Sequence, residues 1–191
     1  MSNNTRAASR PKAPAGRKSP GGKGKWRIPL FWGVVVIVLD LATKAVARHH
    51  FSLWEPITVI PGFFDLIFTE NTGAAFSIFS SEDGEGQGVK MAALAAVSLL
   101  PFIYFYVKAS AADRGLLASL GLIWGGALGN IHDRFRWDAV VDFLDFHVAG
   151  YHWPAFNVAD IAICVGAGLL ALSIWREKPA EGKNPRTGTV S

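Results

Sequence analysis

The sequence has little cysteine and little charge. Cys164 is the only cysteine among 191 residues, so no intrachain disulfide can form. Charged residues make up 18% of the chain, whereas soluble domains average about 25%. Hydrophobic residues make up 50%, and the mean hydropathy is +0.26. These values exclude a disulfide-stapled fold and a chain that is disordered throughout, and they favour a membrane protein.

Several motifs that bind metals or carry catalysis are also absent. The chain has no His-Glu-x-x-His, no P-loop and no Gly-x-Ser-x-Gly. Its histidines show no spacing typical of metal ligands: His49, His50, His132, His147 and His152. We therefore expect no metal and no cofactor. The remaining candidates are carboxylates and amides, which favours acid–base hydrolysis by paired aspartates.

Acidic residues are missing from residues 1–27, which contain eight basic residues. The rest of this segment is mostly Gly, Pro, Ser, Ala and Asn, so it predicts a disordered basic tail. Nucleic-acid binding is the alternative, but no interleaved aromatics or binding fold accompany the charges, and we expect no nucleic-acid partner. Because an apolar run follows at once, a membrane topology signal is the better interpretation.

Four apolar segments follow, at 28–46, 89–107, 116–131 and 155–175. At about 1.5 Å per helical residue they cover about 24–32 Å, close to the roughly 30 Å of a bilayer core. The sequence thus predicts an all-α membrane protein with four transmembrane helices in one domain, 28–175. Pro101 should bend the second helix or shorten its regular part. Ala45-Val46-Ala47 resembles a signal-peptide cleavage site, but the first apolar run is longer than the usual 7–15 residues or so.

The basic residues predict the orientation of these helices. The N-terminal tail, the 108–114 loop and the C-terminal tail 176–191 are basic, whereas the 48–88 loop has six acids and, near its start, Arg48. The positive-inside rule places both termini in the cytoplasm and the 48–88 loop outside. The β-branched and aromatic residues of the 48–88 loop predict two or three short strands, which would form a small extracytoplasmic β-element. A flexible linker, Ser80–Gly88, should follow these strands.

Ionisable and amide residues cluster near the predicted outer ends of these helices, where each charge is costly and marks a functional candidate. Asp40 and Lys44, four residues apart, should share a helix face as a neutralising pair. Asn71 and Gly73 lie in Asn-Thr-Gly-Ala-Ala-Phe, which can bring backbone close to a ligand but is also typical of a turn.

Three further clusters lie in the second half of the chain. Gly125–Arg134 contains Asn130, Asp133 and Arg134, and an Asp133–Arg134 pair at a helix end is the structural alternative there. Asp142 lies among Val and Phe, so its pKa should be raised, whereas Asp145 should be solvated. Asn157 and Asp160 share a helix face; a capping box could explain Asn157 but not an acid before an apolar run.

Taken in order, these motifs resemble those of lipoprotein signal peptidase (signal peptidase II), a family of membrane aspartyl proteases. The resemblance covers about Trp32 to Trp175 and rests on Asp-x-x-Thr-Lys at 40–44, Asn71–Phe76, Gly125–Arg134, Val-Val-Asp-Phe at 140–143 and Phe-Asn-x-Ala-Asp at 156–160. Two positions depart from the pattern: Leu41 replaces a common Gln, and Ile161 replaces a frequent small hydroxyl residue.

The resemblance implies an endopeptidase of the bacterial inner membrane with Asp142 and Asp160 as its catalytic dyad. It makes the following residues supporting or substrate-facing: Asp40, Lys44, Asn71, Gly73, Asn130, Asp133, Arg134 and Asn157. The substrate would be a prolipoprotein with a diacylglyceryl-modified cysteine, cradled at the membrane lipid surface by the outer loop. We expect a monomer. A small proton-coupled transporter and a non-catalytic membrane scaffold are the alternatives.

Overall fold

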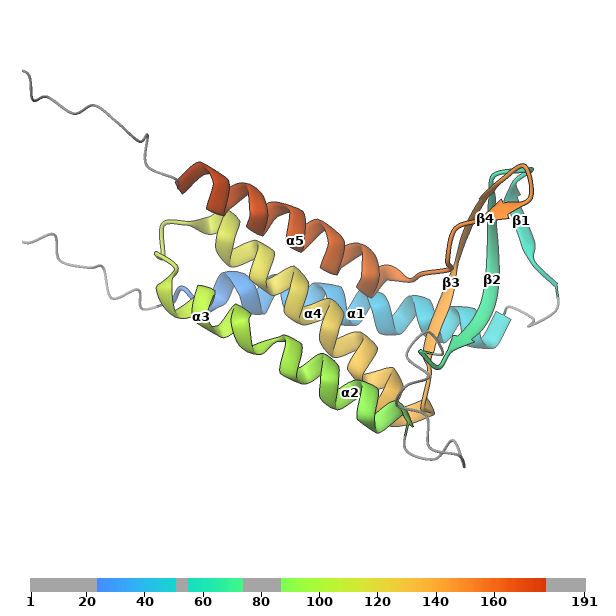
Figure 1. Ribbon diagram of the computed structural model, residues 1–191, viewed down its shortest axis with the longest axis horizontal. Helices are drawn as coiled ribbons and strands as arrows, with labels where there is room; N and C mark the ends of the chain where they lie inside the picture. Colours follow the sequence, from blue (N-terminus) through green and yellow to red (C-terminus); the bar gives the residue numbers. More distant parts are fainter. Residues whose placement is uncertain (1–23, 51–54, 74–86, 178–191) are drawn as a thin grey trace, which may run out of the picture.

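The computed structural model describes residues 24–50, 55–73 and 87–177. Much of the predicted N-terminal tail, most of the C-terminal tail, Ala74–Phe76 of the Asn71 motif and most of the predicted Ser80–Gly88 linker lie outside these residues. The helices run side by side, and an antiparallel sheet lies across one end of them (Figure 1). The elements are α1 (Arg27–His50), β1 (Ile57–Ile60), β2 (Phe64–Asn71), α2 (Gln87–Ser98), α3 (Leu100–Lys108), α4 (Arg114–Trp137), β3 (Val140–Val148), β4 (Tyr151–His152) and α5 (Val158–Glu177).

Within the described residues, three helical stretches are long and apolar enough to cross a membrane: Arg27–His50, Val89–Lys108 and Val158–Arg176. The second consists of α2 and α3, and the helix is interrupted at Leu99, just before the predicted bend at Pro101. The third predicted segment, 116–131, forms most of α4. With 24 residues α4 is long enough to span a bilayer, but its composition is less apolar. The predicted last segment begins later than expected, at Val158.

Small residues let α4 approach α1 and α5 closely. A Cβ on Gly125 would lie 2.7 Å from the carbonyl oxygen of Gly33, and one on Gly126 would overlap the carbonyl of Ala159. A Cβ on Gly129 would overlap the carboxylate of Asp40. This agrees with the use of small residues at helix interfaces in lipid, where backbones pack together. The contact places polar side chains of all three helices within hydrogen-bonding distance.

The sheet has the order β1-β2-β3-β4. Its first two strands lie in the 48–88 segment, as predicted, but β3 and β4 come from the connection between α4 and α5. The predicted β-element is therefore incomplete, because the sequence predicts no strand between α4 and α5. β2 pairs with β3 over a register that includes Asn71↔Val140 and Thr69↔Asp142. This pairing brings the Asn71 motif alongside the Asp142 motif.

The sheet also buries Asp145, which the sequence analysis expected to be solvated. Asp145 is 6% exposed, and its Oδ2 lies 2.8 Å from Nδ1 of His152. On the neighbouring strand, Asp65 Oδ2 lies 3.1 Å from Nε2 of His147. The two imidazole rings stack, with their centroids 4.8 Å apart. The expectation was wrong because strand pairing supplies Asp145 with a partner that the local sequence does not reveal.

Candidate active site

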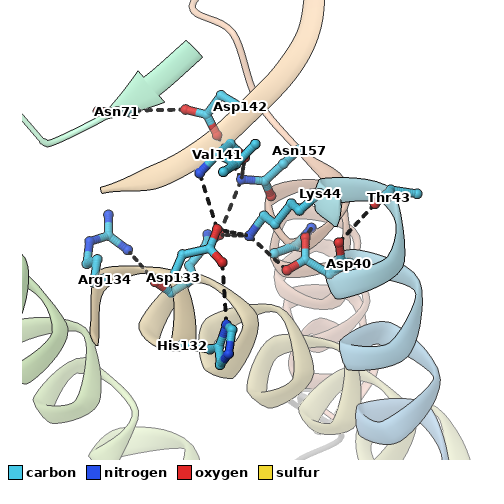
Figure 2. A network of polar contacts seen from close by, with 12 residues as sticks. Asp40, Thr43, Lys44, Asn71, His132, Asp133, Arg134, Val141, Asp142 and Asn157 are labelled. Atoms are coloured by element: carbon cyan, nitrogen blue, oxygen red, sulfur yellow. Dashed lines mark hydrogen bonds and ion pairs between the residues drawn. The ribbon is translucent and has the colours of Figure 1, made fainter. Parts of the chain in front are cut away.

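A buried lysine lies where α1, α4 and α5 meet the sheet. Nζ of Lys44 contacts Asp40 Oδ2 at 2.8 Å, Asp133 Oδ2 at 3.0 Å and Asn130 Oδ1 at 2.9 Å (Figure 2). The ammonium group can donate three hydrogen bonds, so these acceptors match its capacity. Lys44 is 3% exposed, Asp40 0% and Asp133 3%. The predicted Asp40–Lys44 pair is therefore present and forms part of a larger buried ion cluster.

Asp133 does not pair with Arg134, the structural alternative considered above. Consecutive residues on a helix point in different directions, and Asp133 points toward Lys44 instead. Its Oδ2 also accepts from the backbone N–H of Val141 at 3.2 Å, at the start of β3. Arg134 donates from Nη1 to the carbonyl of Asn130 at 3.3 Å. Asp133 thus joins α4 to β3, whereas Arg134 lies apart from the Lys44 cluster.

Two asparagines connect this cluster to Asp142 and Asp160. Asn130 accepts from Lys44 and donates from Nδ2 to Asp160 Oδ1 at 2.8 Å. Asn157 donates from Nδ2 to Asp142 Oδ1 at 2.7 Å and from its backbone N–H to Asp160 Oδ2 at 3.2 Å. Each of the two carboxylates is therefore oriented by amide donors, and Asn157 contacts both.

The first turn of α5 forms a reciprocal capping box. Asn157 Oδ1 accepts from the N–H of Asp160 at 3.0 Å, while Asp160 accepts from the N–H of Asn157. The sequence predicts a capping-box role for Asn157 but not for Asp160, whereas in the structure both residues take part in the capping box. Asp40 holds the same turn from α1, since its Oδ1 accepts from the N–H of Ala159 at 3.0 Å. The position of Asp160 is therefore fixed by three different helices.

Asp142 lies on β3 and is 2% exposed. Its Oδ2 accepts from Nδ2 of Asn71 at 3.0 Å, and Asn71 Oδ1 accepts from the N–H of Gly73 at 2.9 Å. Gly73 has φ +78°, a conformation that favours glycine. Burial raises the pKa of Asp142 from 3.8 to about 6; the hydrogen bonds from Asn71 and Asn157 oppose this rise, and the charge of Asp160 adds to it. The raised pKa predicted from the neighbouring Val and Phe residues is confirmed.

Arg134 has a charge that its local contacts do not neutralise. Its guanidinium interacts electrostatically with Asp160, Asp142 and Asp133, and its Nε is buried without a partner among the described residues. It also lines a cavity of about 460 Å³ whose other walls come from α2 to α5. These walls are apolar except for Asn130, Arg134 and Ser98. Asn130, which lines this cavity, also donates to Asp160. An apolar groove with polar groups in its wall suits an amphiphilic substrate.

All ten residues selected from the sequence thus belong to one connected site, Gly73 through its bond to Asn71. No group of three or more His, Cys, Asp or Glu in the described ranges could hold a metal ion. The sequence analysis missed Arg48, Glu70 and Trp137 at the edge of the site, which are described below. The spacing of these three residues along the chain does not indicate a shared site, because each contacts a residue far away in sequence.

Comparisons with known proteins agree with this geometry. The family model for signal peptidase (SPase) II matches residues 33–176. The chain is 45% identical over 144 residues to the lipoprotein signal peptidase of Oleidesulfovibrio alaskensis, covering 75% of this chain and 92% of that protein. It is also 45% identical over 166 residues to the lipoprotein signal peptidase of Ralstonia nicotianae, covering 85% of this chain and 91% of that protein.

A solved structure shows the same fold. It is a bacterial membrane enzyme determined by the in meso method at 1.9 Å resolution, with a TM-score of 0.68 and 28% identity. The match covers 78% of this chain and 93% of that one. The family model, the sequence identity and the fold agree, and the chain belongs to the signal peptidase II family of membrane proteases.

Proposed function

We propose that Asp142 and Asp160 form the catalytic dyad of this signal peptidase, which removes signal peptides from prolipoproteins. The bond cleaved is the one before the diacylglyceryl-modified cysteine. The observation that carries the assignment is the joint orientation of the two carboxylates by Asn157 and Asn130, next to an apolar groove. Asp40 and Asp133 share the charge of Lys44, and Asp145 contacts His152, so these buried acids are less available for proton transfer.

The dyad works by sharing one proton. Two neighbouring carboxylates cannot both ionise cheaply, and burial of Asp142 increases this cost. The ionised member accepts a proton from a water molecule, which attacks the scissile carbonyl. The protonated member donates its proton to that carbonyl oxygen. As the C–N bond breaks, the other member passes the proton it took from the water to the leaving amine, and a hydroxyl of the tetrahedral intermediate returns a proton to the first member, so the dyad again holds one proton. The pair titrates as a unit, so the two roles belong to the dyad and are not divided between its members here.

The surrounding residues prepare the site for this step. Asn71, Asn130 and Asn157 donate to the carboxylate oxygens and hold their directions before substrate binds. The unpartnered Nε of Arg134 offers a donor to a substrate carbonyl at the end of the groove. Asp40, Lys44 and Asp133 fix the relative positions of α1, α4, α5 and β3.

The 460 Å³ groove receives the apolar part of the substrate. Each methylene that leaves water contributes about 0.8 kcal/mol, so acyl chains can supply much of the affinity. A precursor without its diacylglyceryl group should therefore be cleaved poorly. Membership of a peptidase family argues against the transporter alternative.

The protein is embedded in a membrane, and we propose four spans with α4 as the third. The apolar surfaces of α1 and α5, which flank α4, would face lipid. The end opposite the sheet carries Lys25, Arg27, Lys108, Arg114 and Arg176 (Figure 1). The positive-inside rule then places that end in the cytoplasm of a bacterial inner membrane and the sheet with the dyad at the outer face.

Paired substitutions test the dyad. Asp142→Asn and Asp160→Asn preserve size but remove proton transfer, so each should lower kcat on a lipidated precursor peptide by about 10²- to 10⁴-fold. The double variant should be scarcely worse than either single one. Asp145→Asn is the matched control, because it is a buried aspartate on the same strand with a different partner. The assignment would be wrong if Asp142→Asn, at full expression, cleaved as well as the control.

A further inference from the structure

Arg48 connects three elements at the outer end of α1. Its Nη1 donates to Glu70 Oε1 on β2 at 3.0 Å. Its guanidinium lies over the ring of Trp137, at the end of α4, with 4.1 Å between Cζ and the ring centroid. It also lies 5.7 Å from the ring centroid of Phe68 on β2. One planar group thus joins α1, α4 and β2, which suits arginine better than lysine.

Glu70 is the residue directly before Asn71. In the sheet, Glu70 pairs with Val141 and Asn71 with Val140, at the end of the β2–β3 ladder. Asn71 is exposed and ends β2, yet its Nδ2 donates to the buried Asp142. A residue at a strand end is held by few ladder bonds. Its position therefore depends strongly on whatever holds the neighbouring residue in place.

We propose that Arg48 is a positioning residue for proteolysis. By binding Glu70 while lying over the ring of Trp137, Arg48 anchors the end of β2 to α4 and thereby keeps the amide of Asn71 on Asp142. This inference rests on the proposed dyad, and it adds the Arg48–Glu70–Trp137 contact to the machinery of that site. Arg48 acts through Glu70 and Asn71 and does not itself touch the reacting atoms.

The contact adds little to the stability of the fold. The side chains of Arg48 and Glu70 are 23% and 45% exposed, and ion pairs with such exposure contribute little to folding. Nη2 of Arg48 is buried and has no partner among the described residues, an arrangement that stability alone does not favour. A purely structural role would give Arg48 no influence on Asp142. A positioning role predicts a change in the ionisation of Asp142 without loss of folding.

The experiment compares Arg48→Met, Glu70→Ala and Arg136→Met in purified full-length protein with a lipidated precursor peptide. Arg136 is the matched control, because its Cζ also lies over the Trp137 ring, at 5.0 Å. Arg48→Met and Glu70→Ala should each lower kcat by about five-fold, the scale by which an exposed ion pair shifts an equilibrium. Their double variant should be no worse. Arg48→Lys should recover part of the activity, and Arg136→Met should match the parent protein.

The pH profile of kcat/KM separates positioning from a direct charge effect. Asp142 faces the amides of Asn71 and Asn157 and the charges of Asp160, Lys44 and Arg134. Loss of the Asn71 hydrogen bond raises the pKa of Asp142. The limb of the pH profile that reports ionisation of Asp142 therefore moves to higher pH. Removing the negative charge of Glu70 would by itself move it to lower pH. Glu70→Ala should therefore move the limb to higher pH, as is also expected for Asn71→Ala.

Three results would overturn the proposal: unchanged kcat in Arg48→Met and Glu70→Ala, a limb that is unmoved or moves downward in Glu70→Ala, or equal losses in Arg136→Met. A fall in the thermal unfolding temperature that accounts for the lost activity would also overturn it. A wrong assignment of the dyad would give a different result. In that case Asp142→Asn would remain active, whatever the Arg48 variants do.

Discussion

Replacing Lys44 by methionine tests the buried ion cluster most directly. Methionine has a similar length but no charge, so Asp40 and Asp133 would lose the cation that lies 2.8 Å and 3.0 Å from them. Both carboxylates are almost fully buried, and water cannot replace the ammonium without opening the helix interface. Breaking a buried ion pair by removal of one partner costs about 3–5 kcal/mol.

The expected loss is large enough to measure in detergent. For a domain of this size, each kcal/mol lowers the unfolding temperature by roughly 2–4 °C, so Lys44→Met should unfold about 6–20 °C below the parent protein. Thermal unfolding followed by tryptophan fluorescence at a fixed detergent concentration would measure it. Cleavage should fall as well, because Lys44 orients the Asn130 side chain that donates to Asp160.

A second substitution decides whether the cause is electrostatic. Asp133→Asn in the Lys44→Met background removes one of the two uncompensated charges, so the double variant should be more stable than Lys44→Met alone. In the parent background, Asp133→Asn should destabilise, because it weakens the contact with Lys44. If Lys44→Met lost less than about 1 kcal/mol, or if the double variant were the least stable of the three, the cluster would not hold the helices together.

The sequence predicts the helices of this fold better than its sheet. Hydropathy over three apolar stretches gives α1, the α2–α3 pair and α5, because lipid-facing helices need apolar surface throughout. The fourth apolar segment, 116–131, predicts most of α4, but α4 is less apolar because its buried face includes Gly125, Gly126, Gly129 and Asn130. At these positions small residues let the helix backbones pack closely, and hydropathy does not reveal this kind of packing.

β3 illustrates why the sheet was only partly predicted. Val140–Val148 is buried on both faces near its start and does not alternate between apolar and polar residues. Its partner β2 is about 70 residues earlier in the chain, and the register Thr69↔Asp142 follows from where α4 ends. Local sequence contains no information about this pairing. The pairing of Asp145 with Asp65 on β2 and the contact between Arg48 and Glu70 are likewise formed by residues that are not neighbours in sequence.

The candidate site was predicted more completely than the fold around it. Spacing alone places Asp40 with Lys44 and Asn157 with Asp160, because residues three or four apart share a helix face. The other connections join α1 to α4 and β2 to β3, and family resemblance selected their residues without giving their partners. Lys44 shows the difference: its pair with Asp40 follows from spacing, whereas its contact with Asp133 required the structure.

Two further predictions concern orientation and pH. Reporters fused in the connection after Lys108 should lie in the cytoplasm, and reporters fused after His147 should lie outside; a cytoplasmic signal after His147 would overturn the proposed orientation. The pH dependence follows from Asp142, whose pKa burial raises to about 6. The dyad needs one proton, and above this pH the pair loses it, so that no proton remains for the scissile carbonyl. The kcat/KM of the parent protein should therefore fall on the alkaline side with a midpoint near 6, whereas an ordinary solvated aspartate would place that midpoint near 4. Because the Asn71 hydrogen bond lowers the pKa of Asp142, Asn71→Ala should move this midpoint upward. A midpoint near 4, or one that is unchanged in Asn71→Ala, would show that the limb does not report Asp142.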